Sequence, residues 1–159
     1  MSATIETTLG TFTIEFERDA APNTVANFEK LARQGYYDGV LFHRVVPGFV
    51  IQGGDPTGTG RGGPGYTFAD ELPGATLDYA PYVVAMANAG PDTNGSQWFV
   101  CLADLRGRLP RHYTIFGRVA QGTDIVDRIG RVRTGPADRP VEDVRMTTVT
   151  VDGAAGAEG

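Results

Sequence analysis

Cysteine is nearly absent from this chain of 159 residues, because Cys101 is the only one. A single cysteine cannot form a disulfide within the chain, so packing alone must stabilise the fold. Histidine occurs only twice, at His43 and His112, and neither lies at metal-ligand spacing from Cys101. We therefore expect no bound metal and no structural zinc.

Positive charge is also scarce. The 19 acidic residues exceed the 14 basic ones, which gives a formal net charge of -5, and lysine occurs only at Lys30. Without a basic field to attract phosphates, no nucleic-acid partner is expected. No apolar run approaches the ~20 residues of a membrane helix, so no membrane association is expected. The first residues lack the basic and apolar regions of a signal peptide, which favours a cytoplasmic protein.

Glycine and proline, by contrast, are abundant, with 22 and 10 residues, while hydrophobic residues make up 41% of the chain. This composition is typical of a globular, turn-rich domain. The length suits a single domain, which we place at residues 1–152. The Gly- and Ala-rich residues 153–159 are expected to form a flexible tail.

Hydrophobic periodicity predicts about eight short strands and two helices. Period-two alternation, as in residues 12–16, indicates a hairpin at the start. Pro22 and Gly35 fit the beginning and end of a first helix, and a second covers residues 122–129. Residues 53–81 are rich in glycine and proline, which predicts a surface excursion with at most a short strand near residues 66–68. The predicted strands are 3–9, 11–17, 40–44, 49–52, 82–86, 97–102, 114–119 and 144–151.

One sequence motif and one possible nucleophile are present, but neither has the context that its function requires. Residues 58–63 match G-x-G-x-x-G, but a dinucleotide fingerprint must join a strand to a helix. Pro56 precedes this stretch and Pro64 follows it, so no cofactor is expected. Ser96 could pair with a histidine as a hydrolase nucleophile, but it lacks the G-x-S-x-G elbow.

A different cluster remains in residues 42–55 and 86–99. On alternating strands Arg44 shares a face with Phe42, and Gln97 shares one with Phe99. A cation, an amide and aromatic rings could therefore line one shallow apolar trough. Alternatively, the aromatic side chains are simply core and Arg44 is a solvated strand residue. The pattern alone leaves both interpretations open.

These two segments, with Tyr113 and residues 114–119, resemble the signature stretches of the cyclophilin family of peptidyl-prolyl cis-trans isomerases. The resemblance extends from the first hairpin to about Val151. It implies a mainly β fold, namely a closed eight-stranded antiparallel β-barrel capped by two short α-helices. It also implies an enzyme without cofactors that accelerates rotation about X-Pro bonds and assists protein folding. Its partners would be proline-containing peptides and unfolded or partly folded proteins, and a monomer is expected.

The resemblance also assigns the site residues. Arg44 would be catalytic, and the substrate would be bound by Phe49, Val50, Phe99 and Leu109 around the proline ring and by Gln52, Ala87, Asn88, Ala89 and Gln97 along its backbone.

Two positions depart from the family's commonest pattern. The frequent histidine of the pocket falls on Tyr113, which we assign to the pocket in preference to its neighbour His112. The tryptophan before the pocket leucine aligns with Arg108, so only weak cyclosporin binding is expected.

The alternative function is a proline-peptide-binding chaperone or adaptor without catalysis. Such a module would use the same groove. The combination of Arg44, Gln52 and Phe99 favours the enzyme, because capture alone does not require it.

Overall fold

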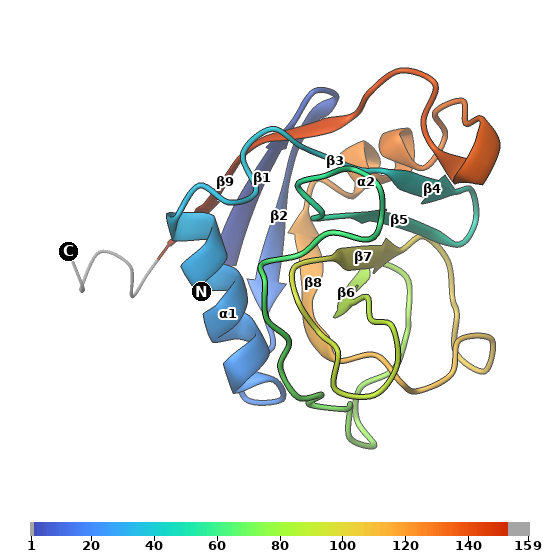
Figure 1. Cartoon of the computed structure of the whole chain (residues 1–159). Helices are drawn as coiled ribbons and strands as arrows, with labels where there is room; N and C mark the ends of the chain where they lie inside the picture. The colour runs from blue at the N-terminus through green and yellow to red at the C-terminus, as the bar shows by residue number, and fades with distance from the viewer. Residues whose placement is uncertain (1, 153–159) are drawn as a thin grey trace.

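A single antiparallel sheet of nine strands organises the fold in the computed structural model, which describes residues 2–152 (Figure 1). In space the strands follow the order β3-β9-β1-β2-β8-β6-β7-β5-β4. The predicted hairpin is present as β1 and β2, with Ile5 opposite Phe12. The strands are β1 (Ser2–Thr7), β2 (Gly10–Phe16), β3 (Val40–Leu41), β4 (Arg44–Val46), β5 (Val50–Gly53), β6 (Val83–Met86), β7 (Trp98–Cys101), β8 (Ile115–Gln121) and β9 (Arg145–Val151).

The expected closed eight-stranded barrel is wrong in its closure and in its strand count. The sheet curls into an open half-barrel, and within residues 2–152 no ladder joins its edge strands β3 and β4. The predicted strand 40–44 is divided between these two edges. The amide of Phe42 still donates to Val144 O (2.8 Å), whereas Arg44 already pairs with Gln52. The chain therefore passes from one edge to the other through Phe42 and His43.

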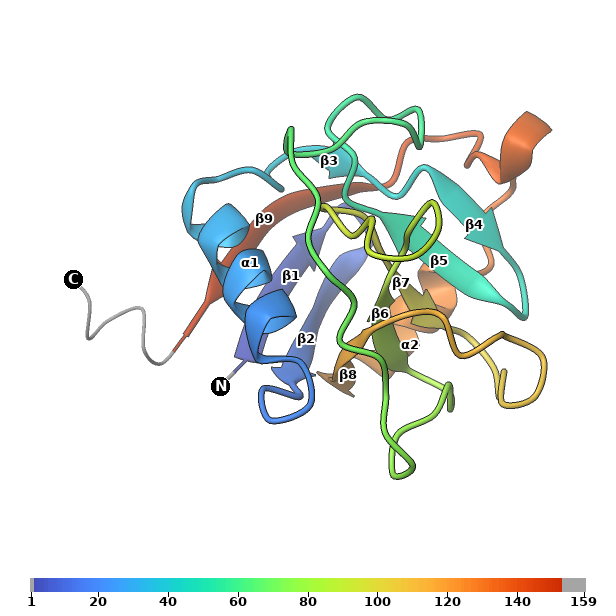
Figure 2. The same ribbon diagram turned by 60° about the horizontal axis from the view of Figure 1, so that its bottom comes forward.

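Both predicted helices are present, as α1 (Pro22–Arg33) and α2 (Thr123–Ile129), and a short 3-10 helix, η1 (Pro136–Asp138), follows. Helix α1 lies beside β1 and β9, while α2 lies apart from it against β2 (Figures 1 and 2). The Glu71 carboxylate accepts the first amides of α1, from Thr24 (2.7 Å) and Asn23 (3.2 Å). These are amides that lack a partner inside a helix.

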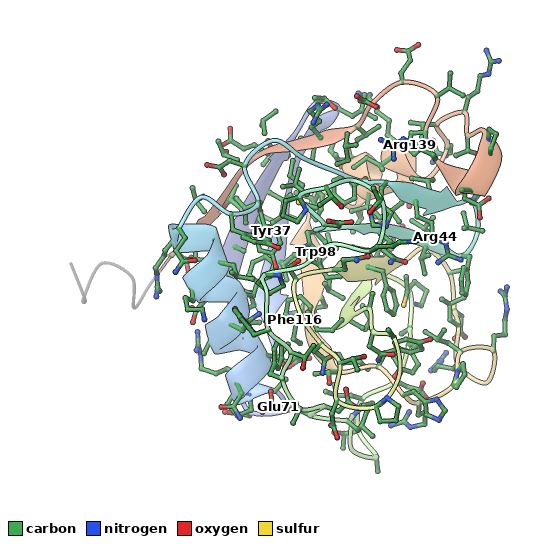
Figure 3. All side chains as sticks on the ribbon, viewed as in Figure 1. Tyr37, Arg44, Glu71, Trp98, Phe116 and Arg139 are labelled. Carbon is green, nitrogen blue, oxygen red and sulfur yellow. The ribbon has the colours of Figure 1, made fainter. Side chains whose placement is uncertain are left out.

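The interior of the curl is packed around one aromatic ring from α1. Phe28 lies 5.1 Å from Tyr37, 5.5 Å from Phe116, 5.7 Å from Phe16 and 6.0 Å from Trp98, measured between ring centroids. Figure 3 shows Tyr37, Trp98 and Phe116 between α1 and the strands. This packing positions α1 firmly against the concave face of the sheet.

A second, smaller apolar cluster lies on the opposite face of β5 and β7. Because side chains alternate along a strand, Ile51 and Val100 enter the interior cluster, while Val50 and Phe99 enter the outer one. The other buried members of the outer cluster are Tyr79, Ala85, Cys101, Leu105 and Ile115. This part of the sheet therefore has apolar side chains on both faces.

Residues 54–82 connect β5 to β6 as a long excursion (Figure 2). The short strand expected near residues 66–68 is reduced to an isolated bridge between Phe68 and Asn94. No helix in residues 2–152 has the length and apolar character needed to cross a bilayer. The predicted tail, residues 153–159, lies outside the described residues.

Candidate active site

Strand register brings the key polar and aromatic side chains into one row. Arg44 on β4 stands opposite Gln52 on β5, and Gln52 stands opposite Phe99 on β7. Residues directly opposite in a ladder project to the same face. The row therefore lies on the outer face of the sheet, and Figure 3 shows Arg44 at its β4 end.

An open groove of about 470 Å³ runs over this row. It brings together nine of the eleven residues assigned from the sequence, and it also contains His43, Thr59, Gly60 and Ala137. The nine are Arg44, Phe49, Val50, Gln52, Ala87, Asn88, Phe99, Leu109 and Tyr113.

One end of the groove is apolar. The rings of Phe99 and Tyr113 meet edge to face, with centroids 5.5 Å apart. The hydroxyl of Tyr79 donates to the carbonyl of Tyr113 (2.7 Å) and accepts its amide (3.1 Å), which fixes the backbone there. His112 is exposed, and its carbonyl accepts the side-chain amide of Asn88 (2.9 Å). Of the two neighbours, Tyr113 is thus the one that lines the groove.

The other end is polar and is spanned by side-chain hydrogen bonds. Arg44 Nη1 donates to Gln52 Oε1 (3.2 Å), and Gln52 Nε2 donates to Gln97 Oε1 (3.2 Å). The guanidinium also lies over the Phe49 ring, with its Cζ 5.9 Å from the centroid. Arg44 therefore contacts both a polar and an aromatic side chain of the groove.

The two remaining assigned residues, Ala89 and Gln97, line an adjoining hollow of about 820 Å³. It shares Gln52, Gly60, Ala87 and Asn88 with the groove. Arg108 is exposed and is not among the residues that line either depression in the described chain.

Sequence reasoning missed four residues of the groove. His43 had a signal in its position beside Arg44, and Thr59 and Gly60 lie in the glycine-rich stretch 58–63. Ala137 carries no such signal. His43 is only 8% exposed, and burial lowers its pKa below the usual 6.5, so the ring is neutral near pH 7. Residues 2–152 hold no group of His, Cys, Asp and Glu side chains that could bind a metal.

Comparisons with known proteins agree on one family. The profile described as cyclophilin type peptidyl-prolyl cis-trans isomerase matches residues 2–151. The human peptidyl-prolyl cis-trans isomerase-like 1 is 52% identical over 145 residues, which cover 89% of this chain and 87% of the human one. A peptidyl-prolyl cis-trans isomerase of Arabidopsis thaliana is 47% identical over 151 residues, covering 93% and 92%.

A solved structure shows the same likeness. A Cryptosporidium parvum cyclophilin type isomerase, crystallised in the presence of the dipeptide Ala-Pro, superimposes with a TM-score of 0.91. It is 32% identical, and the match covers 96% of this chain and 99% of that one.

Proposed function

The chain belongs to the cyclophilin-type peptidyl-prolyl cis-trans isomerases, and from this premise we propose that Arg44 is its catalytic residue. The activity of the family is rotation about X-Pro peptide bonds. The observation that carries the proposal is the position of Arg44 in the groove, where its guanidinium donates to Gln52 and lies over the ring of Phe49.

The reaction breaks no bond. Resonance gives the peptide C–N bond a rotation barrier of roughly 18–20 kcal/mol. The cis and trans forms before proline differ by only about 0.5–1 kcal/mol but exchange over tens to hundreds of seconds. A rate near 10³ per second therefore requires about 7 kcal/mol of transition-state stabilisation. Positioning and a few hydrogen bonds can supply this amount.

Arg44 suits the transition state because twisting the amide makes the prolyl nitrogen pyramidal and returns its lone pair. That lone pair accepts a hydrogen bond that the planar ground state cannot accept. A guanidinium stays charged and offers five N–H donors in a fixed fork. Within residues 2–152 the structure gives it one hydrogen bond, to Gln52, which orients the fork. The interaction is thus stronger in the transition state than in the ground state.

The other assigned residues would hold the substrate on both sides of the bond. The proline ring would enter the apolar end, lined by Phe49, Val50, Phe99, Leu109 and Tyr113. Gln52, Ala87, Asn88, Ala89 and Gln97 would bind the flanking backbone. Fixing both sides confines rotation to one bond.

The proposed substrates are proline-containing peptides and unfolded or partly folded proteins. The presence of Ala-Pro with the Cryptosporidium parvum relative supports the first of these, proline-containing peptides. The proposed working unit is the monomer, since one chain supplies the whole groove. The proposed setting is the cytoplasm, where the thiol of the buried Cys101 would stay reduced.

The proposal is tested by NMR exchange spectroscopy on a short Ala-Pro peptide. Catalytic amounts of the protein are expected to raise the cis-trans exchange rate of the peptide. Cyclosporin is expected to inhibit only weakly, because Arg108 stands where the family commonly has a tryptophan. Saturable binding without faster exchange would instead favour a non-catalytic adaptor. Strong inhibition at stoichiometric cyclosporin would contradict the weak binding expected from Arg108.

The pH dependence of catalysis should be nearly flat between about pH 6 and 8. A guanidinium does not titrate in this range, and burial lowers the pKa of His43, the histidine that lines the groove. The measurement is kcat/KM at half-unit steps of pH with one peptide. A steep bell-shaped profile would point to His43 or His112, and His43→Gln and His112→Gln would distinguish the two.

A further inference from the structure

The loop after β5 is folded around one buried carboxylate. Asp55 is fully buried, and its oxygens accept the amides of Gly60 (2.7 Å), Thr57 (2.8 Å) and Gly62 (2.9 Å). The hydroxyl of Thr57 donates to the same carboxylate (2.8 Å). A Cβ at Gly62 would collide with Asp55 Oδ1, so the loop closes tightly on the carboxylate.

This arrangement gives a structural reason for the glycines of residues 58–63, which match G-x-G-x-x-G. Backbone amides in a glycine-rich loop form a cradle for an anion. Here the anion is the side chain of Asp55 in the same chain, and the amides of Gly60 and Gly62 donate to its carboxylate. Burial raises the pKa of Asp55, but hydrogen bonds from Gly62 and Thr57 outweigh burial and bring the pKa to about 2. The carboxylate is therefore ionised at neutral pH.

Two carbonyls of the same loop face the polar side chains beside Arg44. Gly60 O (2.9 Å) and Gly62 O (3.2 Å) both accept Gln97 Nε2. A carbonyl can only accept, so these two contacts determine which way the Gln97 amide is turned.

The orientation of the Gln97 amide determines the orientation of the Gln52 amide, and Gln52 in turn contacts Arg44. With its NH₂ group on the loop, Gln97 presents Oε1 to Gln52 Nε2 (3.2 Å). Gln52 then presents Oε1 to Arg44 Nη1 (3.2 Å). A reversed Gln97 amide would place its NH₂ group against that of Gln52, and a reversed Gln52 amide would place its NH₂ group against the guanidinium. The loop carbonyls therefore determine which atom of Gln52 faces Arg44.

We propose that Asp55 is a positioning residue for catalysis, acting on the Arg44 guanidinium through the 57–62 loop and the amides of Gln97 and Gln52. The inference rests on the catalytic role proposed for Arg44. Asp55 touches no substrate in this scheme. Asp55 stabilises the loop whose carbonyls orient the side-chain amides of Gln97 and Gln52. These amides in turn keep the Arg44 guanidinium directed toward the groove.

The first test is Asp55→Asn. An asparagine replaces one acceptor oxygen by an NH₂ group that faces amide donors, so the loop carbonyls should shift. We expect kcat to fall about five- to tenfold, with KM rising less than about twofold, because the lost orientation acts in the transition state. An unchanged kcat in folded Asp55→Asn would overturn the proposal.

Glu71→Gln is the matched control. Glu71 is also a loop carboxylate that accepts two backbone amides and a threonine hydroxyl, those of residues 23 and 24. It lies at the α1 end of the molecule, far from Arg44 (Figure 3). Its substitution should lower the melting temperature while leaving kcat within about twofold. A comparable loss of kcat in both variants would mean that general loosening, not orientation of Arg44, causes the effect.

A double-mutant cycle separates this inference from the role of Arg44 itself. In the Arg44→Ala background, Asp55→Asn should lower kcat by less than about twofold, since its target is gone. The same fractional loss in both backgrounds would overturn the positioning role of Asp55 and leave that of Arg44 intact. Full activity of Arg44→Ala alone would instead remove the premise.

Thr57→Val keeps the cycle usable if Asp55→Asn does not fold. Thr57 is exposed, and the change removes the hydroxyl that donates to Asp55 and also contacts Thr59 within the same loop. We expect a two- to threefold loss of kcat that disappears in the Arg44→Ala background. A loss that persists there would overturn the proposal on its own.

Discussion

Arg44→Ala is expected to lower kcat/KM for a proline peptide by at least tenfold, which corresponds to about 1.4 kcal/mol of transition-state stabilisation. Alanine removes the guanidinium donors that are proposed to reach the prolyl nitrogen of the twisted amide. The fold should survive, because Arg44 is half-buried at the groove and does not belong to either apolar cluster. The measurement is kcat/KM for one Ala-Pro peptide, with circular dichroism to confirm the fold.

Two further arginine variants make this result specific. Arg44→Lys keeps the charge but loses the planar fork, so it should recover only part of the activity. Arg118→Ala is the control, because Arg118 forms an exposed ion pair with Glu15 (2.7 Å) on another part of the sheet and should leave kcat/KM unchanged. An Arg44→Ala protein with undiminished turnover would exclude Arg44 from the mechanism.

Among the variants proposed for this protein, Phe28→Ala is expected to cause the largest loss of unfolding free energy. The ring is 1% exposed and contacts aromatic side chains from β2, β7, β8 and the segment after α1. Removing a buried phenylalanine costs about 3–5 kcal/mol of unfolding free energy. For a domain of this size the melting temperature should fall by roughly 6–20 °C, as measured by far-UV circular dichroism.

Leu72→Ala is the control for this effect. Leu72 is 51% exposed, so its truncation should change the unfolding free energy by less than about 0.5 kcal/mol. A loss below 1 kcal/mol in Phe28→Ala would show that the interior is not close-packed around this ring.

Local sequence patterns predicted the individual strands and helices of this fold better than they predicted whether the sheet closes into a barrel. The hairpin of β1 and β2 and the beginning of α1 at Pro22 follow from neighbouring residues, which is why the sequence predicts them. Closure depends on which strands become edges, and periodicity carries no information on pairing partners. Residues 40–44 therefore predicted one strand, although Val40 pairs with β9 and Arg44 pairs with β5.

The candidate site shows the same limit. Pattern alone could not decide whether its aromatic residues are core or groove, and the structure divides them. Phe42 and Trp98 lie in the interior cluster, whereas Phe49 and Phe99 line the groove. Ala137 was unpredictable, because it reaches the groove through contacts between distant segments. One such contact joins Arg139 Nη1 to Gly58 O (2.6 Å), and Figure 3 shows Arg139 above β4.

The alternation along β5 and β7 has a consequence for how this enzyme can evolve. Ile51 and Val100 pack in the interior, while their immediate neighbours Gln52 and Phe99 line the groove. The two sets share a backbone but project to opposite faces. Selection for a new peptide preference can therefore change the outward side chains without repacking the interior cluster around Phe28.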